Sequence, residues 1–287
     1  MNYLELIEKL KRNEDLRDEG LTPPDNVDRF NNIAYGEDPF WQSLDIYRPK
    51  GNDDYLPVIV SVHGGGWVYG DKERYQYYCM SLVQHGFAVV NYTYRVAPES
   101  KFPASIEDTN TVFQWILDHN ETYKLDTNNI FGVGDSAGGH ILGLYANILT
   151  NTNYRKQFNL DIPQNLQLNA IALNCSVSEI RTELEMFLMK ELLPEKGTEK
   201  EFDTLNVAKY ITSDFPPSFI MTCSKDFLKK DASLLSKSLM KQNVPFQFHF
   251  FGTNEILLTH CFHLDMKNKY AHICNKKECE FFKEYIK

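Results

Sequence analysis

The 287-residue sequence lacks any apolar run that approaches the length needed to cross a membrane. Residues 1–12 carry charges throughout and lack an apolar core, so they predict an amphipathic helix with Leu4, Ile7 and Leu10 on one face, not a signal peptide. Six cysteines occur without a Cys-x-x-Cys pair and without a secretory signal. These absences predict reduced thiols, no membrane insertion and a cytoplasmic location.

Basic residues are also fewer than acidic ones. Lys and Arg number 30 against 39 Asp and Glu, which gives a formal net charge of -9. A protein that binds nucleic acid needs a basic face to neutralise phosphates, and none is evident here. The hydrophobic content of 43% and charged content of 24% are typical of a globular protein, and the length fits one domain over residues 1–287. We therefore expect a small-molecule partner and no nucleic acid, and the sequence leaves a homodimer open.

Segments of strand and helix character alternate along most of the chain. The run from Val58 to Val62 is nearly all β-branched, as in a central strand buried on both faces. The other expected strands cover residues 42–47, 87–92, 129–131, 169–174, 217–223 and 246–251, and the expected helices cover 74–84, 104–119, 140–149, 231–242 and 276–286. This alternation predicts an α/β fold with a mostly parallel sheet covered on both faces, whose site lies at the carboxyl ends of the strands.

Two segments do not fit the alternation. Residues 1–40 hold the amphipathic helix and then a turn-rich connection. Residues 176–215 are dense in apolar side chains and too long for a simple crossover between strands. We interpret residues 176–215 as a small helical cap over the site, to which the N-terminal segment contributes. A decorated crossover helix packed on the sheet is the alternative interpretation.

A Gly-x-Ser-x-Gly sequence, Gly134-Asp135-Ser136-Ala137-Gly138, stands between an expected strand and an expected helix. Between a strand and a helix, this motif indicates a nucleophilic serine on a tight turn. The glycines lack the Cβ atoms that would collide where strand and helix come close together. The helix that follows would direct its first amides, including that of Ala137, at the space above Ser136. The alternative is a glycine-rich turn without chemistry.

A second motif, His63-Gly64-Gly65-Gly66-Trp67, comes directly after the buried strand that ends at Val62. Consecutive glycines are costly unless the backbone must approach something closely. In ester hydrolysis the backbone must approach the oxyanion of the reacting ester, which requires preformed N–H donors. We assign this role to the amides of Gly65, Gly66 and Ala137, with Gly64 as a further candidate.

Together with Tyr94-Arg95-Val96-Ala97-Pro98-Glu99, these two motifs resemble the hormone-sensitive-lipase-like branch of the α/β-hydrolase esterases. The resemblance runs from about Leu44 to the C-terminus. It implies an α/β-hydrolase fold with an eight-stranded, mostly parallel sheet and a helical cap. It further implies a serine–acid–histidine triad, no cofactor, and cleavage of short-chain carboxylic esters.

The triad order in such folds is serine, acid, histidine. Asp226 follows an expected strand and is similar to the family's Asp-x-Leu placement, whereas Asp231 lies where it would cap the next helix. For the base, His260 matches the family's His-x-Phe pattern and His263 does not. The segment before His260 departs from the family, because residues 254–258 stand where shorter, glycine-containing loops are usual.

Other site residues are predicted more weakly. Trp67, Tyr69, Tyr94 and Phe187 are aromatic residues that either line the substrate pocket or belong to the core, and Asp135 flanks the nucleophile. The histidines and cysteines at 260, 261, 263, 272, 274 and 279 lack the spacing of a zinc site, so we expect no metal.

The sequence therefore predicts a serine hydrolase that cleaves short-chain, acetyl-type esters through an acyl-enzyme. An amidase such as an arylformamidase, and a carbohydrate deacetylase, are alternatives on the same machinery. A hydrolase-fold protein that has lost catalysis and only binds a ligand is the alternative from another class.

Overall fold

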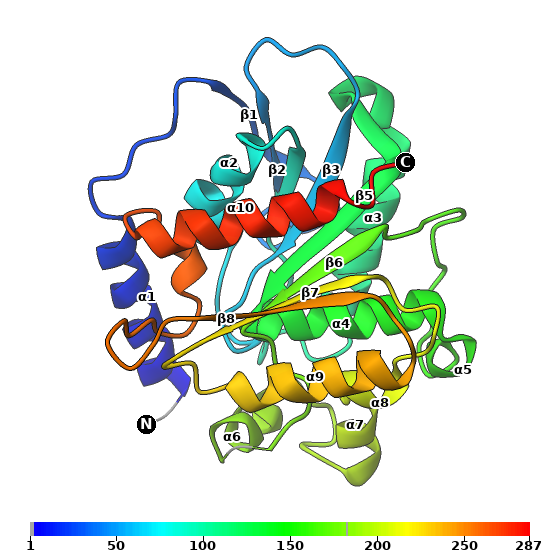
Figure 1. Cartoon of the computed structure of the whole chain (residues 1–287). Coiled ribbons are helices and arrows are strands. Elements are labelled where there is room, and N and C mark those ends of the chain that lie inside the picture. The colour runs from blue at the N-terminus through cyan, green and yellow to red at the C-terminus, as the bar shows by residue number, and fades with distance from the viewer. Residues whose placement is uncertain (1–2, 182) are drawn as a thin grey trace.

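The computed structural model describes residues 3–181 and 183–287, so residues 1, 2 and 182 of the two predicted cap segments lie outside the described residues. Its centre is an eight-stranded sheet in the order β1-β2-β4-β3-β5-β6-β7-β8 (Figure 1). The first two pairings, β1 with β2 and β2 with β4, are antiparallel, and the rest are parallel. The predicted mostly parallel, eight-stranded sheet is confirmed. Its strands are β1 Val27–Ala34, β2 Ser43–Pro49, β3 Leu56–Val62, β4 Ala88–Tyr92, β5 Leu125–Asp135, β6 Ala170–Asn174, β7 Ser218–Cys223 and β8 Phe246–Phe251.

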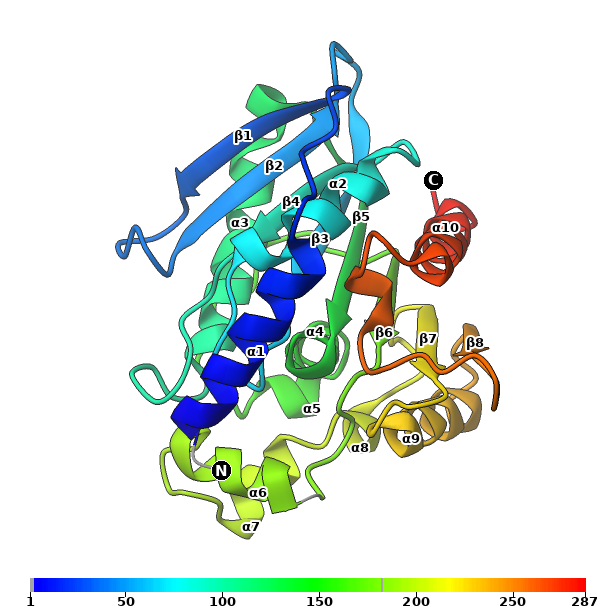
Figure 2. The same cartoon turned by 90° about the vertical axis from the view of Figure 1, so that its left-hand side faces the viewer.

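The central strands are buried on both faces, as their β-branched composition predicts. In β3, Val60 and Val62 contribute to one hydrophobic core and Ile59 to the other, because successive strand side chains point to opposite faces. Helices α3, α4 and α9 supply the first core, and α2 and α10 supply the second. The sheet is thus a layer between two groups of helices, which Figure 2 shows along the edge. The helical elements are α1 Tyr3–Asp18, η1 Lys72–Tyr75, α2 Gln76–Val83, α3 Ala104–Tyr123, α4 Ser136–Thr150, α5 Thr152–Arg155, α6 Glu183–Leu192, α7 Glu199–Thr204, α8 Val207–Tyr210, α9 Lys229–Lys241, η2 Phe262–Leu264 and α10 Lys269–Lys283.

The N-terminal segment differs from the prediction in two ways. Residues 27–34 form β1 instead of a turn-rich connection, and β1 pairs only with β2, at the edge of the sheet. Most of its side chains are exposed, so its sequence lacks the apolar alternation by which a strand is recognised. In α1, Leu4 is exposed, whereas Ile7 and Leu10 are half-buried as predicted.

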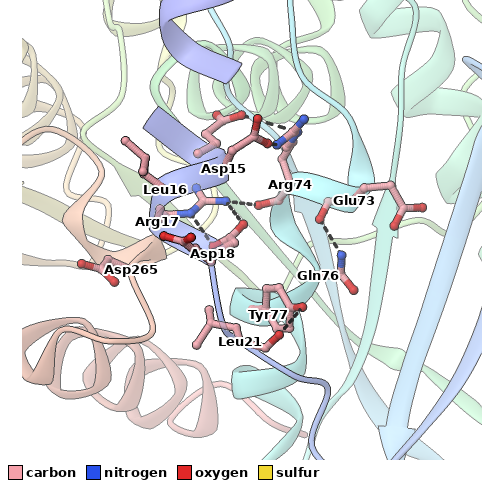
Figure 3. A network of polar contacts seen from close by, with 12 residues as sticks. Asp15, Leu16, Arg17, Asp18, Leu21, Glu73, Arg74, Gln76, Tyr77 and Asp265 are labelled. Carbon is pink, nitrogen blue, oxygen red and sulfur yellow. Dashed lines mark hydrogen bonds and ion pairs between the residues drawn. The ribbon is translucent and has the colours of Figure 1, made fainter. Parts of the chain in front are cut away.

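Polar contacts fasten the carboxyl end of α1 to the η1–α2 region (Figure 3). Arg17 donates to both carboxylate oxygens of Asp18, at 2.8 and 2.7 Å, and to the main-chain carbonyl of Arg74. Arg74 in turn pairs with Asp15, and Tyr77 donates to the carbonyl of Leu21 at 3.0 Å. The amino end of α1 lies beside α6 in both views (Figures 1 and 2). No helix within residues 3–181 and 183–287 has the length and apolar character to span a membrane.

Candidate active site

Ser136 stands at the junction where β5 ends and α4 begins. Its φ of 51° lies in the left-handed region, which is uncommon for a residue with a side chain. Two glycines make this turn sterically accessible: a Cβ on Gly134 would lie 2.7 Å from the carbonyl carbon of Gly138, and one on Gly138 would lie 2.1 Å from the carbonyl oxygen of Val62. The turn therefore requires glycine on both sides of the half-buried serine.

The loop of residues 63–67 lies against this turn. A Cβ on Gly64 would come within 2.8 Å of Oδ2 and 3.1 Å of the main-chain oxygen of Asp135, the residue before the serine. Gly65 has a φ of 120°, and a Cβ there would lie 2.0 Å from the main-chain oxygen of Tyr69. Gly66 has a φ of 63°. The consecutive glycines are thus explained by close approach and by left-handed backbone.

One predicted oxyanion donor, the amide of Gly64, already has a partner within the protein. The N–H of Gly64 donates to the hydroxyl of Tyr75 at 2.7 Å, and that hydroxyl donates to Oδ2 of Asp135 at 2.9 Å. The Gly64 amide is therefore committed inside the protein and cannot serve a substrate oxygen without losing this bond. The amides of Gly65, Gly66 and Ala137 stay as the predicted donors.

Asp226 and His260 come together at the same edge of the sheet. Asp226 follows β7, and its Oδ1 lies 2.7 Å from Nδ1 of His260. The carboxylate also accepts from the hydroxyl of Thr222 at 2.7 Å and from the amide of Leu228 at 3.0 Å. Burial would raise the pKa of Asp226, but the hydrogen bond with His260 lowers it below its ordinary value. An ionised Asp226 holds the proton on Nδ1, which leaves Nε2 of His260 as the basic nitrogen.

His263 and Asp231, the alternatives for base and acid, lie in other surroundings. His263 is fully buried, and neither ring nitrogen has a hydrogen-bond partner among the described residues. Burial lowers the pKa of His263 to about 3, so it is neutral, and its ring packs edge-on against Tyr78 at 5.2 Å between centroids. Asp231 accepts from the amide and the hydroxyl of Ser178 at 2.9 and 2.8 Å, which secures the chain after β6.

The residues predicted to line a pocket differ in burial: some lie in the core and others are partly exposed. Trp67 is 4% exposed and its indole N–H donates to Nδ1 of His140 at 3.3 Å, which favours the core alternative for Trp67. Tyr94 is also core, since it is fully buried and donates to the main-chain oxygen of His63 at 2.8 Å. Asp135 is buried and holds Tyr75. Tyr69 and Phe187 are half-buried.

Both segments that were predicted to form a cap, α1 and residues 176–215, have a contact near the glycine loop. The Tyr69 hydroxyl donates to Oε2 of Glu14 in α1 at 2.7 Å. Leu188 of α6 approaches the loop so closely that a Cβ on Gly66 would lie 3.3 Å from its Cδ1. A hollow of about 660 Å³ elsewhere is lined by residues such as Asn169 and Pro217, which precede β6 and β7. It lies at the amino ends of the strands and is not where this kind of sheet binds substrate.

The family model described as BD-FAE matches residues 44–239, which is more than half of the chain and includes Ser136 and Asp226. The chain belongs to the BD-FAE family. The resemblance to the hormone-sensitive-lipase-like esterases is thereby confirmed at the level of the family.

Several relatives of this BD-FAE chain are named esterases. It is 25% identical to versiconal hemiacetal acetate esterase of Dothistroma septosporum, over 70% of this chain and 66% of that protein. It is 34% identical to esterase LipC of Mycobacterium tuberculosis, over 44% of this chain and 31% of that protein. It is 33% identical to ethyl acetate hydrolase of Pseudomonas putida, over 36% of this chain and 34% of that protein. The matched part therefore spans between about a third and two thirds of these relatives.

Solved structures share the fold of the BD-FAE chain over nearly its whole length. Esterase B from Lactobacillus rhamnosis superimposes with a TM-score of 0.90 and 23% identity, covering 99% of this chain and 95% of that one. The carboxylesterase EstE1 superimposes with a TM-score of 0.80 and 20% identity, covering 100% of this chain and 98% of that one. The fold is the predicted α/β-hydrolase fold.

The Asp226–His260 pair predicts how activity of this BD-FAE chain depends on pH. Burial would lower the pKa of His260, but the hydrogen bond to Asp226 raises it above the ordinary 6.5. A base must be unprotonated, so kcat/KM for an aryl acetate should rise with pH through a midpoint above 6.5. In Asp226→Asn, the midpoint should fall and kcat should drop on the order of 10³-fold or more, since the charge and the Nδ1–H tautomer are both lost.

The matched control for that pH profile, measured between about pH 5 and pH 9, is Asp231→Asn. This change removes a neighbouring buried carboxylate that contacts Ser178 and not the imidazole. Its pH midpoint should equal that of the wild type. An unchanged midpoint in Asp226→Asn would contradict the assigned pair.

Two cysteines lie near the imidazole of His260, of which Cys261 was considered from the sequence and Cys175 was missed. Sγ of Cys261 lies 3.1 Å from Oδ2 of Asp135, which ties the residue after His260 to the residue before Ser136. Cys175 follows β6 directly, and a ring nitrogen of His260 and the sulfurs of Cys175 and Cys261 all lie within 4.8 Å of one another. The available signal was the position of Cys175 just past the carboxyl end of a predicted strand.

Proposed function

We propose that the protein is a carboxylesterase-type serine hydrolase that cleaves short-chain, acetyl-type esters through an acyl-enzyme. The observation that carries this proposal is that the glycine loop, the Ser136 turn, Asp226 and His260 all lie at one edge of the sheet. Gly64 lies against Asp135, Cys261 contacts the same Asp135, and Asp226 binds His260. A left-handed serine, a glycine loop and an acid-supported imidazole are the three components that acyl transfer needs.

The proposed mechanism assigns one task to each component. Nε2 of His260 takes the proton of Ser136, whose oxygen attacks the ester carbonyl. The amides of Gly65, Gly66 and Ala137 donate to the oxyanion, and each such donor is worth on the order of 3 kcal/mol of barrier. His260 then protonates the departing alcohol, and water hydrolyses the acyl-enzyme by the same base. No cofactor takes part in this sequence.

We also propose that α1 and the helices of residues 176–215 form the cap, over one domain of residues 1–287. The contacts of Tyr69 with Glu14 and of Leu188 with the Gly66 position support this role, because both reach the oxyanion loop from outside the sheet. Such close cover leaves little room beside the loop, which favours small acyl groups. The half-buried Phe187 of α6 would then face the acyl chain.

A substrate panel tests this function. We expect kcat/KM to be highest for p-nitrophenyl acetate or butyrate and to fall at least about 10-fold for an ester of eight or more carbons, since the longer chain must displace cap side chains. Ser136→Ala serves as the blank in every assay.

The alternatives predict different orders in the same panel. Faster cleavage of an N-formyl aryl amide than of the acetate would favour the amidase, and faster release of acetate from an acetylated sugar would favour the deacetylase. A wild type that is no faster than Ser136→Ala on every substrate would contradict the enzyme and favour the ligand-binding alternative.

A further inference from the structure

The imidazole of His260 has two thiols beside it as well as a carboxylate. A ring nitrogen of His260 and the sulfurs of Cys175 and Cys261 all lie within 4.8 Å of one another. All six cysteines of the chain are free thiols, so neither sulfur is held in a disulfide. Two sulfurs and one imidazole nitrogen are the ligands that thiophilic divalent cations prefer.

The backbone directs these side chains to one point. Cys175 has a φ of 45° and Cys261 a φ of 57°, and both values lie in the left-handed region that residues with side chains rarely adopt. Ser136, with a φ of 51°, and Trp67, with a φ of 64°, are further such residues at this edge of the sheet. The two thiols are therefore fixed in place by the same kind of backbone strain that presents the serine, and their convergence is a feature of the turns themselves.

We propose that Cys175, His260 and Cys261 form a binding site for a thiophilic divalent cation of the zinc and cadmium class, and that the bound cation switches hydrolysis off. Two sulfurs on one tetrahedral zinc lie about 3.8 Å apart, given Zn–S bonds of about 2.3 Å. The two sulfurs need to approach each other by no more than about 1 Å from their present separation to reach this geometry.

The surroundings supply what such a site needs. Asp226 binds Nδ1 of His260 at 2.7 Å, which is the carboxylate–histidine arrangement that orients metal-binding imidazoles and leaves Nε2 to the cation. The thiol of Cys261 donates to Oδ2 of Asp135 at 3.1 Å, so a second acidic side chain lies at the same place. The imidazole is 22% exposed, so solvent reaches this ligand.

Inhibition follows from the ligand set, and this part rests on the proposed function. The lone pair on Nε2 that would accept the Ser136 proton is the one that a cation would occupy. A thiol releases its proton when it binds a metal, so cation binding should tighten as the pH rises.

Cadmium chloride tests the site by direct binding, with activity as a second readout. We expect the reduced wild type to bind one Cd²⁺ at saturation, with a thiolate-to-metal charge-transfer band in the ultraviolet, and to lose p-nitrophenyl acetate hydrolysis in parallel. EDTA should restore both signals. In Ser136→Ala the band should form as in the wild type, so the binding result stands even if the protein proves not to be an esterase.

Three cysteine variants decide which thiols are involved. Cys261→Ala and Cys175→Ala should each weaken Cd²⁺ binding at least about 10-fold, because one of three ligands is lost. Cys279→Ala, which removes a buried thiol in α10, is the control and should bind like the wild type. Cys261 is only partly buried, so its variant should fold even if that of the buried Cys175 does not. Equal Cd²⁺ affinity in wild type and Cys261→Ala, or a charge-transfer band lost only in Cys279→Ala, would overturn the proposal.

Discussion

His260→Ala is expected to lower kcat/KM for p-nitrophenyl acetate on the order of 10⁴-fold or more, which corresponds to about 5.5 kcal/mol of barrier. Two steps of the proposed mechanism use this imidazole, first to deprotonate Ser136 and later to activate water. Asp226 holds the imidazole at 2.7 Å, and within the described residues no other histidine hydrogen-bonds to that carboxylate. The variant should keep its fold, because the imidazole is partly exposed.

His263→Ala is the matched control, since it removes a histidine three positions later. His263 is fully buried and packs against Tyr78, so its loss should lower the melting temperature. It has no polar contact with Asp226, so the folded variant should keep kcat/KM within about 10-fold of the wild type. Circular dichroism would measure folding beside activity. A reversed result, with His260→Ala active and His263→Ala folded but inactive, would show that the loop before His260 has been aligned wrongly.

The central sheet was predictable because its local signals agree with its environment. A β-branched run such as Val58–Val62 suits only a strand buried on both faces, and each motif follows such a strand. The edge strand β1 gave no such signal. Its residues around Asn32 are polar and exposed, and only the pairing with β2 makes them a strand.

The Asp226–His260 contact and the glycine loop were predictable because they need particular residue types at particular spacings. The roles of Gly64 and Trp67 were not, because each depends on a partner distant in sequence. The amide of Gly64 is taken by Tyr75, and the indole of Trp67 by His140. Cys175 was missed for the same reason: only the fold brings it to Cys261, which lies after a different strand.

Ser136→Ala is expected to have an effect at least as large as that of His260→Ala, on the order of 10⁴-fold or more in kcat, because no acyl-enzyme can form without the hydroxyl. The fold should be unaffected. Alanine and serine have the same difficulty at a φ of 51°, and the neighbouring glycines that permit the turn are unchanged.

Covalent labelling by a fluorophosphonate, read by intact mass, tests most directly whether Ser136 is an activated nucleophile. The reagent phosphonylates a serine only where a base and an oxyanion cradle support attack. The account predicts one adduct per wild-type chain, mapped to the peptide that contains Ser136, and none on folded Ser136→Ala. Equal labelling of both proteins, or a folded wild type that stays unlabelled, would contradict it.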